Sequence, residues 1–73
     1  MENLISADRI LSAYAQKVGS RYFEPAIRFH DGDGWYNYTI YDLTDFWAGV
    51  AIRRLMQGDA RLTIVDDYGH MLT

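Results

Sequence analysis

The sequence predicts a small two-layer α+β domain with the element order α-β-β-α-β, which a short final strand would extend to α-β-β-α-β-β. Three observations predict it: two capped helical segments, two strands folded back on a Gly-Asp turn, and a later run of alternating β-branched residues. We expect a three- to four-stranded, mostly antiparallel sheet with both helices on one face. The 73 residues form a single domain, 1–73, with one modest core.

The first helix is predicted over residues 7–18. Ser6 is a natural N-cap, and Gly19 supplies the stop. Apolar side chains recur between them at helical spacing: Ala7, Ile10, Leu11, Tyr14, Ala15 and Val18. The segment therefore reads as an amphipathic helix with an ordinary solvated polar side.

The two strands around residues 31–34 organise the rest of the chain. If these residues form a four-residue connection, the following residues lie opposite each other: His30 and Trp35, Phe29 and Tyr36, Ile27 and Tyr38, Pro25 and Ile40. One face then carries Phe29, Tyr36, Ile27, Tyr38, Pro25 and Ile40, and the other carries His30, Trp35, Arg28, Asn37, Thr39, Glu24 and Tyr41. A slip of one residue would mix the two sets, so the pattern itself favours this register.

The second helix is predicted over residues 45–57, with Thr44 as the N-cap and Gly58 as the stop. Its broad apolar arc consists of Trp47, Ala48, Ala51, Ile52, Leu55 and Met56. Phe46 and Val50 fall outside that arc, on the side shared with Arg53 and Arg54. Either the first helix covers this side, or it forms a second interface made of Phe46, Val50, Arg53 and Arg54.

A third strand is predicted over residues 61–65, because β-branched residues alternate there. Residues 66–69 form a tight turn, and residues 70–73 pair back as a short fourth strand.

Composition narrows the function classes. The net charge of −3 has the wrong sign for binding nucleic acid through phosphate neutralisation alone, and it suits a protein partner with a basic surface. Cysteine is absent, which is compatible with a reducing compartment. No secretion signal and no apolar run of ~20 residues is found, so we expect a cytoplasmic protein with no membrane contact.

The candidate chemical sites have plain structural explanations. Asp31, Asp33 and Asp42 match three positions of a calcium loop, but Tyr36 occupies the position that requires glycine, and a hairpin turn explains the same residues. Two histidines and two acids could converge on a metal, namely His30, His70, Asp66 and Asp67, although their spacing matches no metal motif. We therefore expect no enzyme, no metal and no cofactor.

The outer hairpin face is the leading binding surface. Its residues are Arg28, His30, Trp35, Asn37 and Tyr41, and Trp, Tyr and Arg are the types enriched at interface centres. The expected partner is another protein, or a second copy of this chain that buries these rings. The competing class is a nucleic-acid-binding accessory protein that uses Arg28, Arg53, Arg54 and Arg61.

No motif in the chain identifies a family. In size, acidity, lack of cysteine and aromatic content the chain resembles the compact inhibitors that bacteriophages and mobile elements encode against host enzymes. That resemblance of style implies a non-catalytic protein-binding module, such as an inhibitor or a regulatory subunit.

Overall fold

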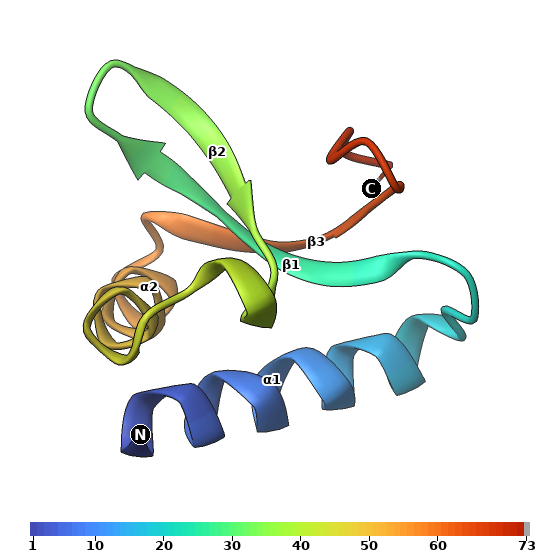
Figure 1. The fold of residues 1–73 in the computed structure, drawn as a ribbon, viewed down its shortest axis with the longest axis horizontal. Coiled ribbons are helices and arrows are strands. Elements are labelled where there is room, and N and C mark those ends of the chain that lie inside the picture. Colours follow the sequence, from blue (N-terminus) through green and yellow to red (C-terminus); the bar gives the residue numbers. More distant parts are fainter. Residues whose placement is uncertain (73) are drawn as a thin grey trace.

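The computed structural model describes residues 1–72, in which two helices cover one side of a three-stranded antiparallel sheet (Figure 1). The elements follow the predicted order: α1 (Glu2–Val18), β1 (Glu24–Asp31), β2 (Gly34–Tyr38), the 3-10 helix η1 (Ile40–Asp42), α2 (Asp45–Gln57) and β3 (Ala60–Val65). The strand order is β2-β1-β3, so β1 is the central strand. The predicted fold class is confirmed.

The β1–β2 hairpin has the predicted register. Its pairs include Ile27 with Tyr38, Phe29 with Tyr36, and His30 with Trp35. The ladder continues to Asp31 opposite Gly34, so the connection is the two-residue turn 32–33 instead of a four-residue one. Gly32 has a φ of +65°, and among residues 1–72 only glycines have a positive φ. Glycine at the first central position is the pattern of a type II′ turn, whose twist matches that of the flanking strands.

β2 is shorter than the sequence predicts. It ends at Tyr38, and Ile40 begins η1, so the expected pair of Ile40 with Pro25 is wrong. A local capping box redirects the backbone: the Asp42 carboxylate accepts hydrogen bonds from the backbone N–H of Thr39 at 3.2 Å and from its hydroxyl at 3.0 Å. Both donors are satisfied within one turn, and this local arrangement replaces further strand pairing.

Helix α1 begins at Glu2, so the prediction that Ser6 caps it is wrong, and Ser6 lies inside the helix. The cap comes from a residue far along the chain. One carboxylate oxygen of Asp45, in the first turn of α2, accepts from the backbone N–H of Asn3 at 2.9 Å and of Leu4 at 3.2 Å. This tertiary contact satisfies the donors that every helix start leaves open, which allows the helix to begin before Ser6.

Helix α2 has the predicted bounds. The Thr44 hydroxyl accepts from the backbone N–H of Trp47 at 3.3 Å, as a Thr N-cap does. Both helices end on the predicted glycines, Gly19 and Gly58, which adopt the left-handed conformation. Within residues 1–72, neither helix has the length and apolarity required to cross a membrane.

The core lies between the helices and the inner face of the sheet, which is the side the helices cover. Its main cluster contains Leu11, Ile27, Phe29, Ala51 and Ala60, and a second cluster contains Ala7, Leu43 and Ala48. Helix α2 packs against both clusters through its small alanines, Ala48 and Ala51. The part of its apolar arc that lies farthest from these alanines remains exposed to solvent. Met56, which belongs to the predicted apolar arc, is 84% exposed.

The chain after β3 folds back over the outer face, the side of the sheet opposite the helices (Figure 1). The predicted fourth strand is reduced to one bridge between Val65 and Met71, and Thr73 lies outside the described residues. Ala26 and Thr63 belong to the outer face by register, yet both are buried. The returning tail therefore covers one end of the outer face and leaves the hairpin end open.

Candidate functional site

The open end of the outer face brings together four of the five predicted hairpin residues. Arg28 pairs with Asn37 and His30 pairs with Trp35 across the β1–β2 ladder, so the four side chains lie on one side of two adjacent strands. We call Arg28, His30, Trp35 and Asn37 the hairpin patch. The side chain of Trp35 is 57% exposed, as predicted from its place on this face.

The Trp35 indole is held between two neighbours. The His30 ring meets it edge-on, with ring centroids 5.5 Å apart and an interplanar angle of 83°. The Arg28 guanidinium lies 5.9 Å from the indole centroid, which is cation–π range. An aromatic ring held in this way loses little conformational freedom when a partner covers it, which favours binding.

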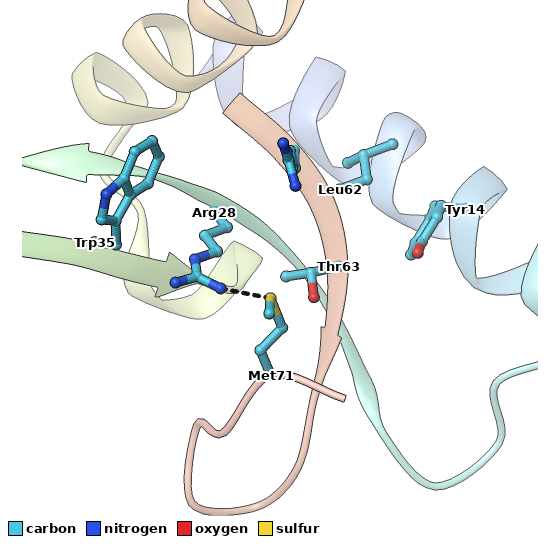
Figure 2. A pocket seen from close by; sticks show the side chains of 7 residues that line it. Tyr14, Arg28, Trp35, Leu62, Thr63 and Met71 are labelled. Atoms are coloured by element: carbon cyan, nitrogen blue, oxygen red, sulfur yellow. Dashed lines mark hydrogen bonds between the residues drawn. The ribbon is translucent and has the colours of Figure 1, made fainter. Parts of the chain in front are cut away.

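A groove of about 440 Å³ lies beside the hairpin patch, and we call it the β3 groove. It is lined by Tyr14, Arg28, Trp35, Arg61, Leu62, Thr63 and Met71. Figure 2 shows Arg28, Trp35 and Met71 on one side of β3 and Tyr14 and Leu62 on the other, so the groove passes around this strand. Arg28 Nη1 donates a hydrogen bond to Met71 Sδ, which joins the central strand to the tail.

Tyr41 is not part of the hairpin patch, and its predicted place on the outer strand face is wrong. It lies in η1, where its side chain is 84% exposed. There it lines a second hollow of about 320 Å³, made by Glu24, Asn37, Thr39, Tyr41, Asp42, Val65, Asp66, Asp67 and Gly69. Asn37 belongs to both the hairpin patch and this hollow, and its side-chain Nδ2 donates to the backbone oxygen of Gly69 at 3.1 Å.

The acids of the calcium-type spacing are bonded elsewhere. Asp31 accepts from the Tyr38 hydroxyl at 2.7 Å, and Asp33 accepts from the Tyr36 hydroxyl at 3.4 Å. Asp42 closes the capping box of η1. In the part of the chain that the structure describes, no group of three His, Asp or Glu side chains is arranged to hold a metal ion.

The two histidines have separate surroundings. His30 lies against Trp35, whereas His70 Nδ1 lies 3.5 Å from the Asp66 carboxylate in the turn after β3. Hydrogen bonds from the backbone N–H groups of His70 and Tyr68 hold the pKa of Asp66 below its ordinary value. Asp66 therefore acts as the organiser of this turn.

A row of aromatic rings on the inner side was missed by the sequence analysis. Neighbouring ring centroids are 4.9 to 6.5 Å apart along the series Tyr36, Tyr38, Phe29, Trp47 and Phe46. Phe29 at the centre is buried, while Tyr36 and Phe46 at the ends are 45% and 69% exposed. The hairpin end projects past the helices, so facing inward does not bury Tyr36.

The residues of the predicted second interface on α2 differ in their surroundings: some are exposed to solvent, and one contacts the hairpin. Phe46 stays exposed, so the alternative that α1 covers it is wrong. Arg53 is exposed and Val50 is half-buried. Arg54 is engaged within the protein: its Nη1 donates to the backbone oxygen of His30, and its guanidinium lies 5.2 Å from the centroid of the Phe29 ring.

Tyr38 provides a test of the hairpin geometry. Burial, followed by the hydrogen bond to Asp31, raises the pKa of Tyr38 to about 12. The phenolate absorbance that Tyr38→Phe removes from the titration curve should therefore be the part that develops near pH 12. Because the unfolded side chain ionises near 10, the free energy of unfolding should fall as the pH rises from 10 towards 12. Loss of absorbance centred near pH 10 in the Tyr38→Phe variant would contradict the contact with Asp31.

No family model, curated protein or solved structure matches this chain. The functional argument therefore starts from the hairpin patch and the β3 groove.

Proposed function

We propose that the protein is a non-catalytic protein-binding module whose main contact surface is the hairpin patch. The observation that carries the proposal is the exposed and oriented indole of Trp35, which lies beside the Arg28 guanidinium on a sheet face that neither helix covers. Trp and Arg are the residue types that most often dominate the binding energy of an interface. A held indole with an adjacent cation is suited to serve as such an anchor.

The proposed role is that of an inhibitor or regulatory subunit, of the kind that bacteriophages and mobile elements encode, acting in the cytoplasm without a cofactor. The protein is small, and its contact surface consists of side chains on a hairpin. Both features support a role in which the protein acts by binding to a partner and covering part of its surface. The net charge of −3 supports a partner whose wider surface is basic.

A second surface on α2 is proposed for homodimerisation or for a further partner. Phe46 is 69% exposed and its ring meets Trp47 edge-on, with centroids 5.5 Å apart, next to the exposed Arg53. Arg54 contributes less to this surface than its position suggests, because it is bonded to the hairpin. Sedimentation analysis at several concentrations tests the dimer, which Phe46→Ala should dissociate.

Nucleic-acid binding through Arg28, Arg53, Arg54 and Arg61 is the competing proposal. Arg54 is already bonded to the backbone of His30, which leaves fewer free cations than the sequence suggests. Titration with a generic duplex and a single strand at increasing salt separates the classes. Affinity that falls steeply with salt would favour nucleic acid over a protein partner.

The Trp35→Ala variant tests the proposed function. Proteins captured by the immobilised wild-type chain are identified, and the affinity of each purified candidate is measured by calorimetry. We expect Trp35→Ala to lower the affinity for the true partner by about 30-fold or more, the effect of losing an interface anchor worth ~2 kcal/mol.

The matched control is Tyr22→Ala, which removes an 82% exposed ring ahead of β1. This variant should bind as tightly as the wild type. If Trp35→Ala binds as tightly as Tyr22→Ala, the hairpin patch is not the contact surface.

A further inference from the structure

Two arginines lie opposite each other on the outer face, and among residues 1–72 neither has a counter-ion. Arg28 of β1 pairs directly with Arg61 of β3 in the antiparallel ladder, and like charges in directly opposite positions destabilise a sheet. Within residues 1–72 the ion pairs are Met1 with Asp45 and His70 with Asp66, so neither guanidinium has a carboxylate at ion-pair distance. The part of the chain that the structure describes therefore places two positive charges on neighbouring strands without neutralising either of them.

The two acids at the hairpin turn do not compensate this pair. Asp31 precedes the hairpin turn and Asp33 lies in it, and their carboxylates accept hydrogen bonds from Tyr38 and Tyr36, whose side chains belong to the inner face. Both carboxylates are thus bonded on the side of the sheet opposite Arg28 and Arg61. In a chain of net charge −3, the β3 groove is a local cationic site.

One of the two cations is already oriented. Arg28 donates to the Met71 sulfur from one guanidinium nitrogen and lies 5.9 Å from the Trp35 centroid (Figure 2). Its remaining N–H groups are still available as donors, since a guanidinium carries five. The groove beside it, about 440 Å³ in volume, has apolar walls from Trp35 and Met71 on this side of β3. This combination suits a carboxylate carried on a short apolar stem.

We propose that the β3 groove receives an acidic side chain, Asp or Glu, of the protein partner, with its carboxylate between Arg28 and Arg61 and its stem against Trp35. The inference rests on the proposed function, because it names the chemistry of the group that the hairpin patch recognises. A single carboxylate inside a wider basic surface also agrees with the negative net charge of this chain. Two guanidinium groups at one groove are too few to follow a polyanion backbone, so a protein carboxylate is favoured over nucleic acid.

The test uses short peptides as probes at low salt. Acetyl-Glu-Phe-Glu-amide is titrated into the ¹⁵N-labelled protein, with acetyl-Gln-Phe-Gln-amide as the neutral match, and the side-chain N–H signals of Arg28, Arg61 and Trp35 are followed. The acidic peptide should shift these three signals and the neutral peptide should not. Arg28→Gln and Arg61→Gln should each weaken binding by about three- to fivefold, the effect of one exposed charge pair.

Arg9→Gln, which removes an exposed arginine of α1, should leave binding unchanged. Arg61→Gln should also raise the melting temperature at low salt, because it removes the repulsion from Arg28. An arginine that only stabilised the fold would instead lower the melting temperature when replaced.

Three outcomes would overturn the proposal. The first is equal shifts with both peptides, and the second is unchanged affinity in both arginine variants. The third is binding of an oligothymidine that is tighter than that of the acidic peptide and steeply salt-dependent, which would assign the groove to phosphate. The proposed function has its own test. If Trp35→Ala leaves the affinity for the partner unchanged, the proposed function is refuted, independently of the peptide results.

Discussion

Replacing Phe29 with alanine is expected to remove a large part of the protein's free energy of unfolding. The ring is fully buried and stacks on Tyr38, with centroids 4.9 Å apart, and Trp47 lies beyond it at 6.5 Å. Truncation of a buried Phe to Ala destabilises by ~3–5 kcal/mol. A chain of this length has a total stability of roughly 4–11 kcal/mol. Urea unfolding followed by circular dichroism measures the loss.

Tyr36→Ala is the matched control for this prediction. Tyr36 pairs with Phe29 across the β1–β2 ladder and faces the same side of the sheet, but it is 45% exposed. We expect a loss of about 1 kcal/mol or less, because little apolar area leaves the core. Similar losses for the two variants would show that the core does not centre on Phe29.

Asp45→Ala is expected to lower the melting temperature by about 4–8 °C, the shift that corresponds to losing one helix cap in a domain of this size. The Asp45 carboxylate accepts from the amino group of Met1 and from the backbone N–H groups of Asn3 and Leu4, so the variant removes the cap of α1. Asp8→Ala, which removes an exposed carboxylate of α1, should leave the melting temperature almost unchanged.

The same contact predicts a pH dependence. Hydrogen bonding to the Met1 amino group and to the backbone of α1 lowers the pKa of Asp45 below its ordinary value of 3.8. A carboxyl group with a lowered folded-state pKa stabilises the protein above its unfolded pKa and loses that effect as the pH falls through the folded value. The difference in melting temperature between wild type and Asp45→Ala should therefore be constant from about pH 5 to about pH 7 and shrink as the pH falls below 3.8. A difference that grew in acid would contradict the contact.

The parts of the fold that the sequence predicted are those with local signals. Helix α2 has Thr44 before it and Gly58 after it, and the hairpin register follows from alternation around residues 31–34. The start of α1 could not be predicted, because its cap is Asp45, some forty residues further along the chain. The end of β2 could have been predicted, since Thr39-x-x-Asp42 has the spacing of a capping box.

The candidate site was predicted only in part for the same reason. The exposure of Trp35 and its pairing with His30 follow from the register alone. The contact of Met71 with Arg28 depends on the tail folding back over the outer face, which no local pattern indicates. Likewise, the sequence places Asp31 beside the hairpin patch, and only the structure shows that its carboxylate is bonded to Tyr38.

The most direct test of the account is the solvent access of the Trp35 indole in the free protein. In a Trp47→Phe variant, Trp35 is the only indole left, since the chain contains two tryptophans. Quenching of its fluorescence by acrylamide should be strong and independent of protein concentration, and the bound partner should reduce it. An indole that is already protected in the free monomer would contradict the account, because the proposed contact surface would not be available.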